Sequence, residues 1–311
     1  MSEQVEETEQ ATAPRGPWSS RRPGEAALAY ALAYLLLAGG GGLFAAQISS
    51  PAALVVLVTA VAAATLTLSL LLVLSICRLP MRPRAEFASM FAMMVLFCLL
   101  RPSVFIFLGR WLGRPQAGQR IAEMLFIIPG QELLGNLALI LWATFLGRLI
   151  SRVIREGKLL LPVALVASLA DIITVFWGVV AHITETAPEV AQAFSASAPL
   201  APPPGIPAPI LSAIGIGDFL FLAVFLAVAL RYSMQTARTL WATLVLTLVA
   251  PFAFFIWPDA PGLPGLPFIS AAVLWANWRH LEFTREEKRA LAFAGALVAA
   301  AAVSIWLVLH R

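Results

Sequence analysis

The chain has 311 residues, of which 60% are hydrophobic and only 12% are charged, and its mean hydropathy is +0.86. A water-soluble domain of this length could not bury so much apolar surface, so the composition excludes an ordinary soluble protein and indicates a polytopic helical membrane protein. The net charge of +4 comes from basic residues that flank apolar segments, so we expect a lipid bilayer around the protein and no nucleic-acid partner.

The first 25 residues are polar and acidic, and we expect them to form a disordered tail. Nine apolar segments follow, and most reach the roughly 20 residues that a helix needs to cross a bilayer. They cover residues 26–48, 52–76, 87–109, 133–151, 159–182, 210–230, 239–257, 264–278 and 291–309. The sequence therefore predicts an all-α, multi-pass transmembrane bundle of about nine spans. The stretch 121–131 is ambiguous and could lie along the membrane interface.

We divide the chain into four parts on this basis. Residues 1–25 are the tail, 26–158 the N-terminal transmembrane helices, 159–280 a core that carries the acidic residues discussed below, and 281–311 an additional C-terminal transmembrane helix.

Most Lys and Arg residues lie in alternate connections: before the first segment and after the second, fourth, sixth and eighth. The positive-inside rule then places the N-terminus in the cytoplasm and the C-terminus outside. Arg110, Arg114 and Arg120 fall on the opposite side. The Ala/Leu/Pro/Arg-rich composition favours a prokaryotic inner membrane.

Three residue types have simple interpretations. Cys77 and Cys98 lie in or beside apolar segments, which is typical of small core residues rather than of a disulfide or a metal site. The three histidines lack the spacing of a zinc site, so we expect no metal and no organic cofactor. Arg101 lies inside the third apolar segment, where it could snorkel or pair with a buried acid, and the sequence leaves both open.

Two acidic residues lie well inside predicted spans. They are Asp171, in the segment 159–182, and Asp218, in Gly215-Ile216-Gly217-Asp218 within 210–230. An ionised carboxylate in hydrocarbon costs several kcal/mol, so each is a candidate functional residue. Their helices run in opposite directions, and we expect both acids roughly 12–17 Å below the outer ends. Two such carboxyls close together cannot both ionise easily, and a pair that shares one proton can activate water.

The residues around these acids also have candidate roles. Gly215 and Gly217 remove side chains beside Asp218, so that either a substrate or a packed helix can approach. The run Leu263-Pro264-Gly265-Leu266-Pro267 predicts an irregular helix start, which in a membrane is tolerated against protein or a water-filled cavity. The connection 183–209 lacks Lys and Arg and should face outward, either as a linker or as a gate over the site.

These motifs, in this order, resemble the presenilin and signal peptide peptidase family of GxGD intramembrane aspartyl proteases. The resemblance covers roughly residues 159–280 and is most specific at Gly215-Ile216-Gly217-Asp218-Phe219. It implies a presenilin-like fold, with Asp171 and Asp218 as the catalytic pair and Gly215 and Gly217 as residues that shape the site. Pro264, Gly265 and Leu266 would stand where the family has a Pro-Ala-Leu motif that contacts the site and the substrate.

The chain departs from the family pattern at four points. Ala170 stands where the family usually has Tyr before the first Asp, and Gly265 is the middle residue of the Pro-Ala-Leu position. We count four spans before the Asp171 helix where the family has five, and one additional span after the Pro-Gly-Leu helix.

The outward connection between the two Asp helices resembles signal peptide peptidase and favours substrates with a cytoplasmic N-terminus.

The sequence thus predicts an aspartic endopeptidase that hydrolyses peptide bonds within transmembrane segments of membrane proteins or signal peptides. A prepilin-peptidase-like GxGD enzyme is disfavoured because Asp171 lies in a deeply apolar context. A proton-coupled transporter or channel remains a second hypothesis, since paired membrane acids also relay protons. An inactive relative that binds membrane proteins is a third. The expected partners are a transmembrane peptide or membrane-protein substrate and the bilayer, and a homo-oligomer is left open.

Overall fold

The structure is a computed structural model, and it describes residues 22–45, 48, 50–125, 130–176, 194–197, 213–250, 263–281, 283–286 and 288–289. The tail predicted over 1–25 and the span predicted over 291–309 lie almost wholly outside these described residues.

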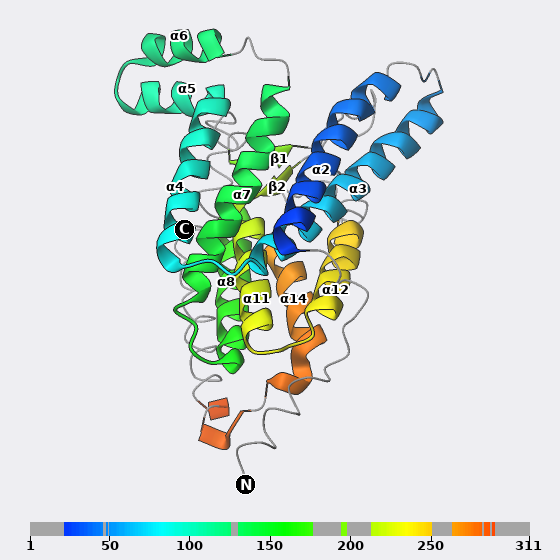
Figure 1. The fold of residues 1–311 in the computed structure, drawn as a ribbon, viewed down its shortest axis with the longest axis vertical. Coiled ribbons are helices and arrows are strands. Elements are labelled where there is room, and N and C mark those ends of the chain that lie inside the picture. The colour runs from blue at the N-terminus through cyan, green and yellow to red at the C-terminus, as the bar shows by residue number, and fades with distance from the viewer. Residues whose placement is uncertain are drawn as a thin grey trace, which may run out of the picture.

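The described chain is a bundle of α-helices (Figure 1). Five of them are long and apolar enough to cross a membrane, as expected of an integral membrane protein. They are α2 (Pro23–Ala45), α3 (Pro51–Cys77), α4 (Pro83–Leu100), α7 (Gln131–Ser151) and α8 (Leu160–Phe176). The shorter helices are α5 (Pro102–Trp111), α6 (Pro115–Leu125), α11 (Ile216–Arg231), α12 (Thr236–Val249) and α14 (Leu266–Asn277). Two 3₁₀ turns, Gly157–Leu159 and Trp278–His280, complete the helical elements.

Proline sets the start of five successive helices, α2 to α6. A proline at the first helical position loses no hydrogen bond, because the first N–H groups of a helix have no partner within it, and its fixed φ already suits the helix. The same residue type produces the break between α4 and α5. Pro102 disfavours helical backbone at Arg101, which is extended at φ −115° and ψ 95°.

Helix α11 is the centre of the bundle. Phe219, Leu222, Phe225 and Leu226 on it are all at most 2% exposed, and the helix packs against α3, α7, α8, α12 and α14. Its approach to α7 depends on Gly147, where a Cβ atom would lie 2.8 Å from the Cβ of Ala223. Small residues at such a crossing allow two backbones to come close, which is a common basis of helix association in membranes.

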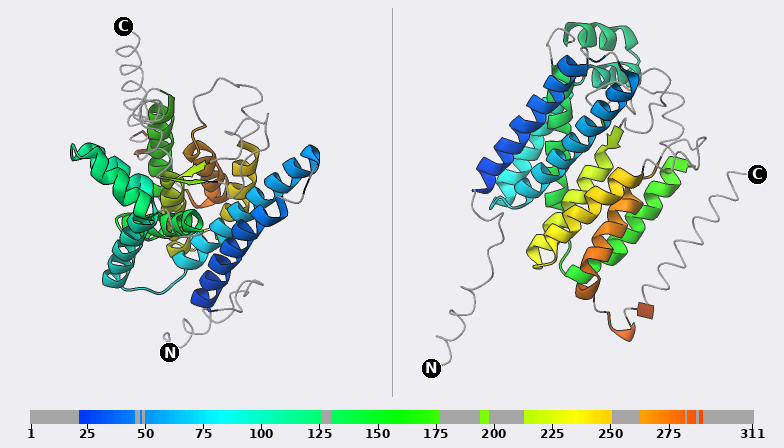
Figure 2. Two further views of the ribbon diagram at one scale, coloured as in Figure 1. Left: turned by 90° about the horizontal axis from the view of Figure 1, so that it is seen from above. Right: turned by 90° about the vertical axis from the view of Figure 1, so that its right-hand side faces the viewer.

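Helices α8, α12 and α14 lie side by side on one flank (Figure 2). Two buried side chains of α14 tie them together. Ser270 donates to the carbonyl of Ala164 on α8 at 3.2 Å, and Asn277 donates to Thr239 Oγ1 on α12 at 2.8 Å. Both bonds satisfy polar groups that would otherwise be costly in an apolar bundle.

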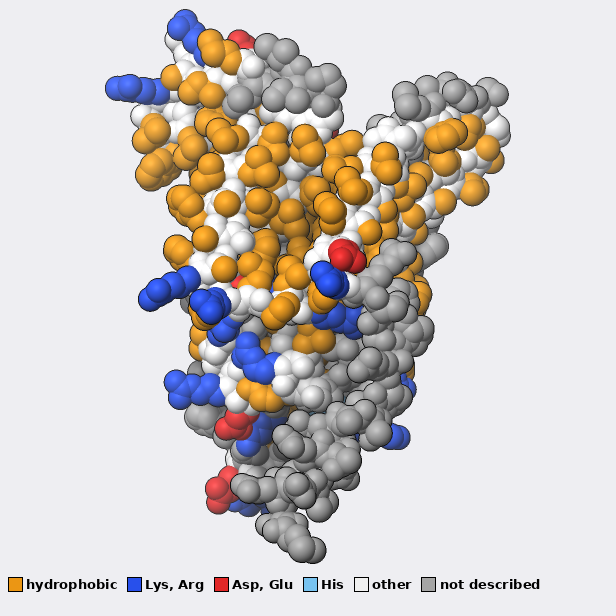
Figure 3. Space-filling model, in the orientation of Figure 1, with side chains coloured by type: hydrophobic (Ala, Val, Ile, Leu, Met, Phe, Trp, Pro, Cys, Tyr) orange, Lys and Arg blue, Asp and Glu red, His pale blue; other side chains and the backbone are white. Residues whose placement is uncertain are grey.

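The surface separates apolar from basic regions. In the view of Figure 3, hydrophobic side chains cover much of the upper half of the molecule, while Lys and Arg lie at its upper left edge and across the lower half. Leu36 and Val56 are 76% and 69% exposed. Such exposed apolar residues over long helices are typical of surfaces that face lipid.

Several predicted boundaries need correction. The third span was predicted over 87–109, but α4 ends at Leu100 and a separate helix follows. The span predicted over 210–230 begins as a strand, β2 (Ala213–Gly215), and α11 starts only at Ile216. The span predicted over 264–278 has its helix from Leu266 to Asn277, after the irregular start that the sequence predicted. Cys77 and Cys98 are both free thiols, as predicted.

Helices α5 and α6 pack against each other and lie across the end of the bundle (Figure 1). The ambiguous stretch 121–131 supplies the last turn of α6 and the first residue of α7, while 126–129 lie outside the described residues. Arg110, Arg114 and Arg120, which the positive-inside rule put on the unexpected side, are exposed on this helical pair.

Candidate functional site

Asp171 and Asp218 lie on different helices and meet at one dipeptide. Asp171 is in the second half of α8, and its Oδ2 accepts a hydrogen bond from the backbone N–H of Leu266 at 3.0 Å. Asp218 is the third residue of α11 and lies against Gly265, where an added Cβ atom would be 2.5 Å from Asp218 Oδ1. Gly265 and Leu266 are consecutive, so they bring the two carboxylates into one site.

The two acids lie at comparable heights in the bundle. Asp171 is 11 residues after Leu160, the first residue of α8, and Asp218 is 13 residues before Arg231, the last residue of α11. At 1.5 Å per residue these offsets correspond to about 16 Å and about 20 Å from the basic end. The predicted convergence is therefore present, although the reason given for it needs correction. Asp218 lies two residues past the first residue of its helix, whereas the predicted start at residue 210 placed it eight residues past.

Each carboxylate accepts a hydrogen bond near a helix N-terminus. Asp218 Oδ2 accepts from the N–H of Gly215 at 3.2 Å, in the manner of a capping box at the start of α11. Asp171 Oδ2 likewise accepts a hydrogen bond from the N–H of Leu266, the first residue of α14. The first N–H groups of a helix have no partner within it and carry partial positive charge, so they favour an anion. Helix termini thus stabilise negative charge at this point in an apolar bundle.

The site contains no basic partner among the residues that the structure describes: no described Lys, Arg or His forms an ion pair with Asp171 or Asp218. Both side chains are partly buried. Two carboxyls that interact without a neutralising cation favour a state in which one holds a proton. The arrangement can therefore supply one proton donor and one proton acceptor at the same place.

The glycines predicted to shape the site differ in what they do. At Gly217 no atom of the described chain lies within 4 Å of an added Cβ, so none of the described helices packs against this glycine. At Gly215 the nearest relevant contact is an ordinary 3.6 Å to Asp218 Oδ2. Gly265 is the glycine with a steric requirement, because its Cβ would also lie 2.8 Å from Asp218 Cγ. Pro264 before it and Leu266 after it are both buried.

A short hairpin flanks the site. Strand β1 (Ser195–Ser197) pairs antiparallel with β2 (Ala213–Gly215), and Ser195 stands opposite Gly215. The N–H of Ile216 donates to the carbonyl of Phe194 at 3.0 Å, which continues the pairing into the first residue of α11. The sequence predicted a linker or a gate over 183–209. Only 194–197 of that range are described, and the rest of that prediction lies outside the described residues.

Arg101 holds this hairpin to the bundle. Its guanidinium donates to the carbonyl of Ser195 at 3.0 Å and to the side-chain oxygen of Asn136 on α7, and the residue is only 7% exposed. Gly135 leaves room for it, because a Cβ there would lie 3.1 Å from Arg101 Nε. These contacts hold Arg101 inside the bundle and not at its surface, where a snorkelling side chain would lie.

Aromatic packing supports the same hairpin. The ring of Phe97 on α4 stacks on Trp142 of α7 at 5.4 Å and lies 5.8 Å from the ring of Phe194, next to β1. Sequence reasoning missed Phe194, Asn136 and Arg101 as neighbours of the site, because their proximity depends on a tertiary arrangement and not on a local motif.

Comparison with known proteins adds nothing to this geometry, since no protein-family model, no curated protein and no solved structure matches the chain.

Proposed function

We propose that the protein is an intramembrane aspartyl protease that cleaves peptide bonds within transmembrane segments. One observation carries this proposal: Asp171 from α8 and Asp218 from α11 converge on Gly265–Leu266 without a described cation to neutralise them. The motif resemblance to presenilin and signal peptide peptidase supports the same assignment, together with a presenilin-like arrangement of about nine spans. An inner-membrane location with a cytoplasmic N-terminus belongs to the same proposal.

The chemistry follows from a carboxyl pair that shares one proton. The ionised carboxylate takes a proton from water while the water oxygen attacks the scissile carbonyl carbon, and the protonated carboxyl donates its proton to the carbonyl oxygen. The resulting gem-diol collapses when one of its hydroxyl groups returns a proton to the carboxylate that is now ionised, the C–N bond breaks and the nitrogen takes the proton held by the other carboxyl. The pair ends with one proton again, ready for another cycle.

The backbone donors have a defined part in these steps. The N–H groups of Leu266 and Gly215 hold one oxygen of Asp171 and one of Asp218. Fixed donors orient a catalytic group before the reaction, so less reorganisation is needed in the transition state. The space beside Gly217, with no described atom within 4 Å of an added Cβ, is where we place the approach of a locally unwound substrate.

The test is cleavage of a panel of single-span helical peptides by the purified full-length protein in liposomes. Wild type is compared with Asp171→Ala and Asp218→Ala, with folding and yield checked for each. We expect wild type to cut at least one peptide within its apolar segment and either substitution to abolish cleavage. Cleavage that survives both substitutions would contradict the proposal.

The same liposomes separate a protease from a proton-coupled transporter. A pH-sensitive dye trapped inside them reports proton flux. The proposal predicts no flux that depends on the two aspartates. Flux that is lost in both alanine variants, in the absence of peptide cleavage, would favour the transporter instead.

A further inference from the structure

A cavity of about 420 Å³ lies at the basic end of the bundle, where α3, α7 and α11 end. Four arginines line it: Arg78, Arg148, Arg152 and Arg231. Glu86 is the only acidic residue in its lining. It is separate from the aspartate pair, which lies toward the opposite ends of α8 and α11.

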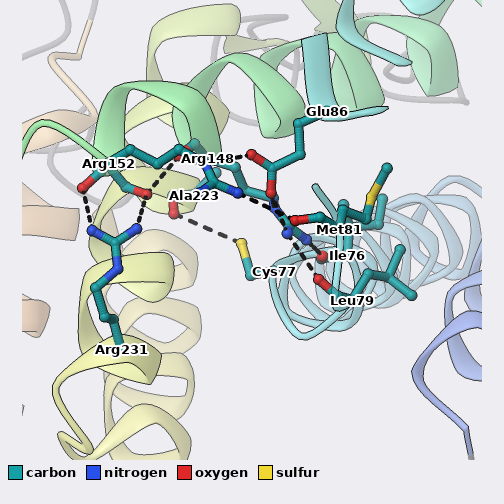
Figure 4. Close-up of polar contacts among 10 residues, drawn as sticks. Ile76, Cys77, Leu79, Met81, Glu86, Arg148, Arg152, Ala223 and Arg231 are labelled. Atoms are coloured by element: carbon teal, nitrogen blue, oxygen red, sulfur yellow. Dashed lines mark hydrogen bonds and ion pairs between the residues drawn. The ribbon is translucent and has the colours of Figure 1, made fainter. Parts of the chain in front are cut away.

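Glu86 neutralises only part of this charge. It is 1% exposed, and it bridges two guanidinium groups: Arg148 Nη2 lies 2.5 Å from Oε1 and Arg152 Nε lies 2.7 Å from Oε2 (Figure 4). One carboxylate against four guanidinium groups leaves the lining with a formal excess of three positive charges. Such a concentration in a concave site attracts anions.

Two of the arginines, Arg148 and Arg231, donate hydrogen bonds to carbonyl groups at helix C-termini. Arg148 donates to the carbonyls of Ile76 and Leu79, at the end of α3 (Figure 4). Arg231 donates to the carbonyl of Ser151, the last residue of α7, and to that of Ile154, just beyond it. Cations are stabilised at helix C-termini, so this pair has a structural role that fully accounts for its presence.

The other two arginines have donors to spare. The Arg78 side chain is exposed, and among the described residues none forms an ion pair or hydrogen bond with its guanidinium group. The Arg152 side chain is 38% exposed, and it uses Nε for Glu86 and Nη2 for a 3.3 Å contact with the carbonyl of Met81. A guanidinium group binds phosphate with two parallel N–H donors, so Arg78 and Arg152 can together hold one phosphate group.

We propose that this cavity binds the phosphate of an anionic phospholipid headgroup, with Arg78 and Arg152 as its ligands and the Glu86–Arg148 pair as its fixed wall. A dissolved phosphate ion offers the same chemistry, but the surroundings favour a lipid. Ile150, in the last turn of α7, and Val153, just after it, flank the lining residues Ser151 and Arg152 in the chain and are 41% and 77% exposed, which gives acyl chains an apolar surface. Basic pockets between transmembrane helices at the cytoplasmic side are suited to anionic headgroups.

The experiment measures binding of phosphatidylglycerol to the full-length protein, by native mass spectrometry in detergent, with phosphatidylcholine as the uncharged reference. We expect saturable binding of one phosphatidylglycerol and no comparable binding of phosphatidylcholine. Arg78→Gln with Arg152→Gln should weaken binding about 25-fold, at about fivefold for each arginine near a membrane surface. Arg84→Gln is the matched control, because Arg84 is exposed at the start of α4 but does not line the cavity, and we expect less than a twofold change.

A second variant tests the same cavity independently, in case the double variant does not fold. Ala227 lines the cavity, and Ala227→Leu fills part of it without changing any charge. It should weaken phosphatidylglycerol binding about as strongly as the double mutant. Equal effects of Arg84→Gln and Arg78→Gln, or unchanged binding in Ala227→Leu, would overturn the proposal in favour of diffuse surface attraction. Displacement of the lipid by millimolar inorganic phosphate would overturn the lipid assignment and leave a site for dissolved phosphate.

Discussion

Glu86 and the Asp171–Asp218 pair are acidic groups on helices of one apolar bundle. Their surroundings differ in whether a basic side chain neutralises the acid. Glu86 is bonded to two arginines and joins α4 to α7 (Figure 4). The two aspartates meet at Gly265–Leu266 and accept hydrogen bonds from backbone N–H groups, and no described cation pairs with either. A neutralised acid can serve as a structural link. An acid beside another acid has to share a proton, which is what acid–base catalysis requires.

The largest expected effect belongs to the aspartate pair. Asn has nearly the shape of Asp but cannot take or give a proton in the same way, so Asp171→Asn or Asp218→Asn should lower kcat by about 10⁴-fold or more. Thermal unfolding in detergent should show no loss of stability in either variant. Peptide cleavage and unfolding are measured on the same preparations. A variant that keeps activity would remove its aspartate from the mechanism.

The next effect concerns stability alone. Arg148→Met leaves Glu86 buried with half of its partners, and breaking a buried ion pair typically lowers the free energy of unfolding by about 3–5 kcal/mol. The activity of the remaining folded protein should be unchanged. Arg155→Met is the control, because Arg155 is exposed and should change stability by less than about 0.5 kcal/mol. Equal effects of the two substitutions would show that the Glu86 link is unimportant.

Gly265→Ala tests how closely the aspartates must approach the backbone. The new methyl group would lie 2.5 Å from Asp218 Oδ1, so the carboxylate must shift. Displacement of a catalytic group by about an ångström can lower activity about 100-fold, and we expect a loss of about 10- to 100-fold with little change in stability. Gly40→Ala is the matched control, because Gly40 lies inside α2 with no described atom within 4 Å of its added Cβ. Full activity of Gly265→Ala would show that Asp218 adapts freely.

The smallest effect should come from Arg101, whose described link to the site runs through Ser195 of β1. Arg101→Met removes the donors to Ser195 and Asn136, and Ser195 is paired with Gly215, whose N–H holds Asp218. We expect kcat to fall about tenfold while KM changes little, because a positioning effect acts on the reacting groups. Arg101→Lys, which keeps a donor, should recover part of the rate. Equal loss in both variants, with KM raised, would point to substrate binding instead.

The helices and the aspartate pair could be predicted from the sequence because their signals are local. Long apolar runs predicted α2, α3, α7 and α8. The two acids inside such runs were candidate functional residues because a charged group in lipid has a high free energy. The start of α11 at Ile216 could not be placed, since β2 is three residues long and its partner lies eighteen residues earlier at Ser195–Ser197. Strands of this length show no alternation that a sequence pattern can detect.

The polar links between helices were also beyond the sequence. Glu86 stood at the edge of a predicted span and gave no sign of its pairing with Arg148, which is 62 residues away. The same holds for Arg101 and Ser195, separated by 94 residues. Such contacts depend on which faces of the helices pack against each other. The apolar faces of these helices are similar in sequence, so the sequence does not determine which pairs of faces meet. The tight approach at Gly265 belongs to the same class, because it depends on the place of Asp218 on another helix.

The most direct test of the aspartate pair uses a peptide in which a hydroxyl-bearing carbon replaces the scissile carbonyl, as a mimic of the gem-diol. Its binding to wild type, Asp171→Asn and Asp218→Asn is measured in detergent by displacement of a labelled copy. The mimic is stabilised only where both carboxyls reach its hydroxyl, so we expect tight binding to wild type and a loss of at least about 100-fold in each variant. Equal binding to all three proteins would contradict a shared aspartate site.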